Sequence, residues 1–252
     1  MALRGSADVA ALLVDGYNIL GTVTQITDKQ MGKTERTDGL GDAWEEHTFT
    51  GVREAEITQE GFYDDAANSA HAALSSGPGN SSRILVYCPE GTATGQNFKG
   101  MRAVQVDYDV QAERGMLHKA KAIYKANGRF DQGVILYTHK PTAGTSAEVG
   151  NVVSATNPTH PTTVSSTGGG VGLLQLSAFT SAALATGVRA RVQHSSDDVT
   201  YADLITFTVA TAAPFAERVE TTAVVESHLR MATSYQGGAS AQATLFVGFA
   251  RR

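Results

Sequence analysis

GVRARVQHS, at Gly187–Ser195, alternates apolar and polar side chains along most of its length. Its valines and alanine, beginning with Val188, face one side of an extended chain, and the arginines and glutamine between them face the other. A period of two residues predicts a β-strand with one buried face. The segment therefore indicates a sheet that covers a core on one side and meets solvent on the other.

Segments of the same kind flank this strand on both sides. Turn residues at 196–198 and 236–238 separate several of them, at spacings typical of all-β folds. We expect residues 172–252 to form a C-terminal β-sandwich domain. Its other predicted strands are residues 172–179, 201–209, 218–227, 228–235 and 241–250.

Towards the N-terminus the chain is also rich in strand patterns. Residues 10–19 predict a strand that turns at Asp15 and Gly16, and residues 21–40 predict a strand followed by a long loop. Asn127 and Gly128 favour a tight turn, so we expect a hairpin between residues 117–126 and 133–137. Further strands are predicted at residues 52–59, 83–88 and 104–110.

One helix is predicted, over residues 64–74, where alanine is frequent and Asp64 or Asp65 could cap the first turn. Gly and Pro after residue 75 end it. Residues 141–171 are rich in Pro, Ser, Thr and Gly and predict a linker or extended arm. The expected domains are thus residues 1–140, with the helix near 64–74, and residues 172–252.

The charge balance excludes several function classes. The net charge is −5 and only 18% of residues are charged, with no basic run longer than Arg251-Arg252, so we expect no tight DNA binding.

Cys88 is the only cysteine, which leaves no intrachain disulfide. The short apolar run near the N-terminus lies between acidic residues and predicts neither a signal peptide nor a membrane span.

No group of residues predicts an enzyme. The seven histidines show no metal-ligand spacing. Asp64 and Asp65 are explained by helix capping, and Asp197 and Asp198 by a turn. We therefore expect no catalytic, metal or cofactor-binding residue, and no cofactor.

Two stretches carry a family resemblance. The first is DGYNI at residues 15–19 with TDGLGDAWEEHTFTGVREAEITQEGFYDDA at residues 37–66; the second is VRARVQHSSDDVTYADLITFTV at residues 188–209, with HLRMATSY and ATLFVGFAR after it. Together they resemble the major tail tube proteins of long-tailed, siphovirus-type bacteriophages. Tyr201 stands where tryptophan is common in that pattern.

The resemblance implies a mainly β, tail-tube-type sandwich or barrel with one flanking α-helix, plus the C-terminal β-sandwich as an outer decoration. It implies a structural virion protein that assembles in the host cytoplasm into stacked, hexameric rings, which form the conduit for DNA ejection. Its partners would be copies of itself and other tail proteins, with DNA passing through the lumen and no membrane. Residues 21–42 would be the inter-ring loop. The self-assembly candidates are Thr24, Ile26, Asp28, Met31, Trp44 and Phe62.

Two other functions stay open. The C-terminal sandwich has the size and pattern of a carbohydrate-binding, host-attachment module, in which Tyr201 and Tyr235 could stack on sugar rings. The chain could also be another virion structural protein, such as a capsid decoration or tail-terminator protein.

Overall fold

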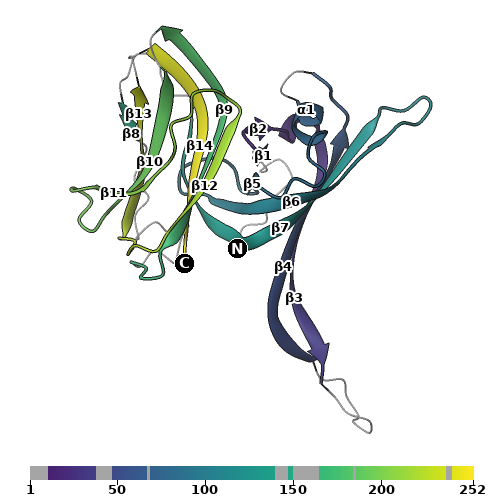
Figure 1. Cartoon of the computed structure of the whole chain (residues 1–252), viewed down its shortest axis with the longest axis horizontal. Helices are drawn as coiled ribbons and strands as arrows, with labels where there is room; N and C mark the ends of the chain where they lie inside the picture. Colours follow the sequence, from purple (N-terminus) through teal and green to yellow (C-terminus); the bar gives the residue numbers. More distant parts are fainter. Residues whose placement is uncertain are drawn as a thin grey trace.

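The computed structural model describes residues 11–37, 47–66, 69–139, 147–149, 165–183, 186–236 and 240–252. Most of these residues lie in antiparallel strands (Figure 1). The elements are β1 (Ala11–Val14), β2 (Tyr17–Asn18), η2 (Leu20–Thr22), β3 (Val23–Arg36), β4 (His47–Phe62), α1 (Ala70–Leu74), β5 (Arg83–Cys88), β6 (Asn97–Gln111), β7 (Lys119–His139), β8 (Ala147–Val149), β9 (Gly170–Ala183), β10 (Gly187–Ser195), β11 (Ala202–Thr206), β12 (Phe215–Thr221), β13 (His228–Gln236) and β14 (Ser240–Arg251). The mainly β prediction is confirmed.

A ten-stranded sheet runs through both halves of the chain, in the order β12-β9-β14-β7-β6-β5-β1-β2, with β3 and β4 as a branch. Its centre is β7, which has 21 residues. One edge of β7 pairs with β6, and the other pairs with β4 over residues 119–125 and with β14 over residues 134–139. Because β7 pairs with both β4 and β14, strands from before and after residue 140 belong to one sheet. The described strands form an open sheet, not a closed barrel.

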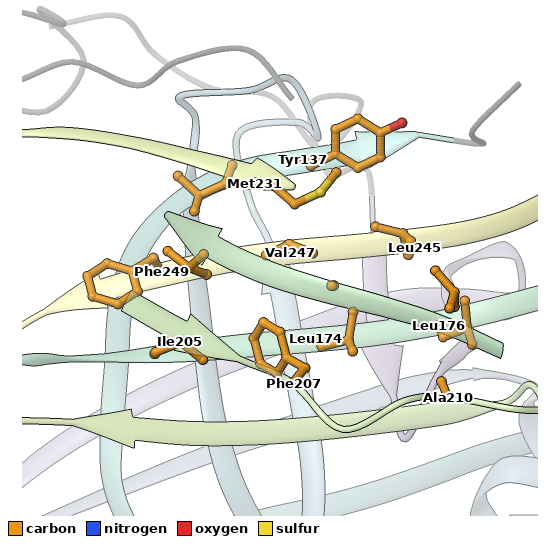
Figure 2. Close-up of a cluster of buried hydrophobic side chains, with 14 of the residues drawn as sticks. Tyr137, Leu174, Leu176, Ile205, Phe207, Ala210, Met231, Leu245, Val247 and Phe249 are labelled. Carbon is orange, nitrogen blue, oxygen red and sulfur yellow. The ribbon is translucent and has the colours of Figure 1, made fainter. Parts of the chain in front are cut away.

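The C-terminal half contains the expected sandwich. A four-stranded sheet, β11-β10-β13-β8, packs against β9, β14 and the end of β7. Leu174 of β9, Val247 of β14 and Met231 of β13 contribute to the shared core, together with Phe207 just after β11 (Figure 2). The alternation in β10 has its predicted role, because its apolar side chains are buried and its arginines are not.

In the N-terminal half, α1 packs against one face of the large sheet, and side chains of β1, itself a strand of that sheet, join the same core. Leu74 of α1 and Leu12 of β1 pack on Ile57 and Tyr124, and all four are fully buried. The predicted helix over residues 64–74 is wrong in its extent, since α1 begins only at Ala70. The Asp64 carboxylate accepts a hydrogen bond from the N–H of Ala66, in the irregular segment before the helix. It therefore does not cap α1.

The hairpin predicted at Asn127 and Gly128 is wrong. Both residues lie inside β7, where Gly128 has φ +108° and the register with β6 shifts by extra residues on β7. Asn127 donates its side-chain amide to the carbonyl of Ser81 at 2.7 Å. The positive φ that suits a two-residue turn also suits a β-bulge, so the local signal was real and the structure it produces is different.

Two other predictions need correction. The long loop expected after residue 21 is instead β3, which pairs with β4 from Val23↔Gly61 to Arg36↔His47; residues 38–42 of the expected inter-ring loop lie outside the described residues. Of the expected linker over residues 141–171, residues 147–149 form β8 and residues 170–171 belong to β9.

Candidate assembly surface

The branch formed by β3 and β4 continues beyond the sheet as a two-stranded arm. We define the arm as residues 29–36 and 47–54, every one of which is exposed. It extends away from the rest of the molecule (Figure 1). The arm exists because β4 leaves β7 after the pair Glu56↔Lys125, while its pairing with β3 continues.

The arm carries apolar side chains that have no core to enter. Met31 is 42% exposed, Phe49 47% and Val52 50%. The Phe49 ring lies across Gly32, where a Cβ atom would approach it to 2.9 Å, and the Arg53 guanidinium lies 5.9 Å from the ring centroid. A hydrophobic group on a projecting hairpin is typical of a surface that another molecule covers.

Five of the six residues predicted for self-assembly lie in the part of the chain that the structure describes, and they do not form one cluster. Ile26 and Asp28 lie at the base of the arm, where Ile26 packs on the N-terminal core and Asp28 forms an ion pair with Lys99. Met31 lies on the arm itself. Thr24 donates its hydroxyl to the carbonyl of Glu60 at 3.2 Å.

Phe62, at the end of β4, is 42% exposed, and Trp44 lies outside the described residues. Phe49 and Val52 were not among the predicted residues. The alternation around them was visible in the sequence, but alternation cannot distinguish a strand face that packs in its own chain from one left open.

The face of the sheet opposite α1 carries many charged side chains. On β7, Ala120, Ala122 and Tyr124 point into the core, so the residues between them point outward with their partners on β4 and β6. The hydrogen bond from Lys121 to Glu60, 2.8 Å long, raises the pKa of that lysine. This polar face holds Lys29, Lys119, Lys121, Lys125, Glu56, Glu60, Asp107 and Asp109. Its formal charges cancel.

A second hairpin, between β6 and β7, ends in a turn with two large apolar side chains in solvent. Met116 is 63% exposed and Leu117 71%. Val110, before the turn, is 39% exposed. The arm and this hairpin point in different directions (Figure 1).

Two ion pairs, one buried and one half-buried, join parts of the large sheet. Asp131 of β7, with 1% of its side chain exposed, accepts hydrogen bonds from Nε and Nη2 of Arg218 of β12, each 2.8 Å from its Oδ2 atom. Asp15 accepts from Arg83 at 3.0 Å and from the N–H of Ile84 at 2.8 Å. Burial raises the pKa of both carboxyls, and the arginines counteract it.

The tyrosines considered for sugar stacking are both engaged within the chain. The guanidinium of Arg230 lies 3.7 Å from the centroid of the Tyr201 ring, so one face of that ring is covered. Tyr235 packs against the sandwich core. Asp197, in the predicted turn, accepts from Ser195, Val199 and Thr200, as a turn residue does.

Within the described ranges, no three His, Cys, Asp or Glu residues come close enough to hold a metal ion. In the same part of the chain, no helix is long and apolar enough to cross a bilayer. Cys88 is fully buried, and burial raises the pKa of its thiol to about 12.

Comparison with known proteins gives limited likenesses. No protein-family model matches the sequence, and no curated protein sequence matches it. Among solved structures, a chain in the tail of an empty gene transfer agent particle, refined with C6 symmetry, is 13% identical, with a TM-score of 0.39; the match covers 51% of this chain and 97% of that one. The Dit protein of SPP1, a hub adsorption protein of phages that infect Gram-positive bacteria, is 8% identical, with a TM-score of 0.36, and the match covers 95% and 98%. These scores lie below 0.5, so the proposals below rest on the geometry of this chain.

Proposed function

We propose that the protein is a structural subunit of a long-tailed bacteriophage tail, which assembles with copies of itself into rings that stack as a tube. The observation that carries the proposal is the exposed arm. A lone copy holds Met31, Phe49 and Val52 in water on a hairpin with solvent on both faces. Burying such side chains against a neighbouring copy is favourable by about 25 cal/mol per Å² of apolar area. The resemblance of residues 37–66 and 188–209 to tail tube proteins supports the same function.

The edges of the large sheet also support assembly. Among the described strands, β3 pairs with β4 alone and β12 pairs with β9 alone. Residues 126–133 of β7, between the positions of β4 and β14, pair with no described strand on that edge. Unpaired edges are templates for another chain, and closing strands into a ring removes them.

The polar face suits the lining of a DNA channel. A channel wall with excess positive charge would hold phosphates and slow the passage of DNA. On this face Lys121 lies between Glu60 and Asp109, and Glu56 lies between Lys125 and Lys29, so its four lysines and four carboxylates are intermixed. We therefore propose that this face is turned towards the lumen, while the sandwich of the C-terminal half lies outside.

Negative-stain electron microscopy of the purified full chain tests the proposal. We expect rings, and at high protein concentration stacked rings. The double variant Met31→Asp/Phe49→Asp should stay monomeric at the same concentration, because two charges on the arm oppose its burial. Val199→Asp, at a side chain 80% exposed in the C-terminal half, is the matched control and should assemble normally.

Circular dichroism and thermal melting show whether the arm variant keeps the fold. A wild-type chain that remains monomeric over a wide range of concentration and salt contradicts the proposal. So does an arm variant that assembles like the wild type. Rings that close but never stack would favour a terminator or decoration protein over a tube subunit.

A further inference from the structure

The outer face of the four-stranded sheet gathers three arginines. Val188, Ala190 and Val192 of β10 point into the sandwich core, so Arg189 and Arg191 between them point outward. The pairing Gln193↔Arg230 puts a third arginine, on β13, on the same face. We call Arg189, Arg191 and Arg230 the arginine face.

Side-chain contacts fix two of these arginines in place. Arg191 donates to Asp203 at 3.3 Å, and Gln193 donates to the other oxygen of the same carboxylate at 2.7 Å. Arg230 donates from Nε to Gln193 at 2.9 Å, and its guanidinium stacks on Tyr201. Side chains held before a ligand arrives lose less conformational freedom on binding.

Tyr201 is itself held. Its hydroxyl donates to Asp198, and burial together with this hydrogen bond raises the pKa of Tyr201 to about 12. The phenol therefore keeps its proton and its position below Arg230 at neutral pH.

The donors of this face exceed its acceptors. Among the described residues, Arg189 has no hydrogen-bond or ion-pair partner, and the terminal amino groups of Arg230 have none either. The Nε atoms of Arg189 and Arg191 are buried without a partner. Asp203 pairs with Arg191. Among the described residues it is the only carboxylate that forms an ion pair with any of the three guanidinium groups. A chain with net charge −5 thus concentrates positive charge on one sheet face.

We infer that the arginine face binds an acidic polysaccharide, with the free guanidinium groups taking its carboxylates and Asp203 and Gln193 taking its hydroxyl groups. A guanidinium offers paired N–H groups that match the two oxygens of a carboxylate. The exposed carboxylate of Asp203 accepts hydrogen bonds from hydroxyl groups, which sugars have and duplex DNA lacks. A duplex phosphate backbone offers no hydroxyl donor to Asp203, so the mixed donor and acceptor set fits an acidic sugar better than a nucleic acid.

This inference does not depend on ring assembly, because the arginine face and the arm belong to different sheets. A soluble monomer could bind the sugar, and a tube subunit could fail to bind it. The two proposals therefore fail separately.

Isothermal titration of the full chain with oligogalacturonate, a neutral malto-oligosaccharide of equal length and inorganic polyphosphate tests the inference. We expect binding of the oligogalacturonate that weakens as salt rises, no binding of the neutral sugar, and weaker binding of polyphosphate. Arg189→Gln and Arg230→Gln should each weaken binding about tenfold or more, since each removes a free guanidinium group and its charge-assisted contact. Arg102→Gln, at an exposed arginine on β6, is the control and should bind normally.

Arg230→Lys keeps the charge and removes the paired N–H groups, so we expect an affinity for oligogalacturonate between that of the wild type and that of Arg230→Gln. Circular dichroism verifies that each variant is folded. The inference is overturned if the wild type binds no oligogalacturonate, if polyphosphate binds more tightly, or if Arg102→Gln loses as much affinity as the arginine-face variants.

Discussion

Replacing Arg218 by Met should test how firmly the two halves of the chain are joined. Arg218 on β12 and Asp131 on β7 lie on strands that are not neighbours in the sheet, and their pair is nearly inaccessible, with 11% and 1% of the side chains exposed. The variant leaves the Asp131 carboxylate buried without its arginine. Glu220 keeps its contact with Arg252 at 2.7 Å, so the loss falls mainly on Asp131.

Breaking a buried pair by removing one partner costs about 3–5 kcal/mol. For a chain of this length, each kcal/mol lowers the melting temperature by about 2–4 °C, which gives a drop of about 10 °C. The control Lys121→Met breaks an exposed pair with Glu60, whose side chains are 40% and 44% exposed, and should lower the stability far less.

The loss should depend on pH in a defined direction. Burial already raises the pKa of Asp131, and removing Arg218 takes away the main interaction that lowers it. A carboxyl whose pKa is higher in the folded than in the unfolded protein binds a proton more readily when folded. The destabilisation of Arg218→Met should therefore be full at neutral pH and shrink as the pH falls through the folded pKa of Asp131.

Urea unfolding followed by circular dichroism at several pH values measures both effects. The double variant Asp131→Leu/Arg218→Met should recover much of the lost stability, because no unpaired charge remains buried. The reasoning is refuted if Arg218→Met costs no more than Lys121→Met at pH 7, or if its cost does not change with pH.

Two further substitutions test the packing of the sheet. Gly16→Ala should destabilise the protein by about 2 kcal/mol or more in urea unfolding, because Gly16 has φ +89° and a Cβ atom there would lie 2.6 Å from backbone atoms of β9 and β12; Gly21→Ala, where no atom lies within 4 Å of the added Cβ, should be nearly neutral. Leu12→Ala should cost about 2–5 kcal/mol at a fully buried site, whereas Leu117→Ala, at a side chain 71% exposed, should change stability by less than about 0.5 kcal/mol. Equal losses at Leu12 and Leu117 would mean that the core is placed wrongly.

Strands with a two-residue apolar period or a continuous apolar run could be predicted from the sequence. The segments Arg83–Cys88 and Gly187–Ser195 have their predicted bounds, and the C-terminal sandwich was expected from its strand and turn spacing. A strand with one buried face needs an apolar side chain at every second residue, so its burial is visible as an alternating sequence pattern. The turn was also predicted at Asp15 and Gly16, and both residues adopt positive φ in the structure.

Long-range pairing was decided only by the tertiary structure. Asn127 and Gly128 can form a turn or a bulge, and the bulge forms because β7 continues to meet β6 on one edge and β14 on the other. On the β3 side of the arm no two-residue apolar period separates a strand from a loop, so the pairing of β3 with β4 is visible only in the structure. Residues such as Arg189 and Arg230, 41 positions apart, share a face only because β10 and β13 pair, and local patterns carry no information about which strands become neighbours.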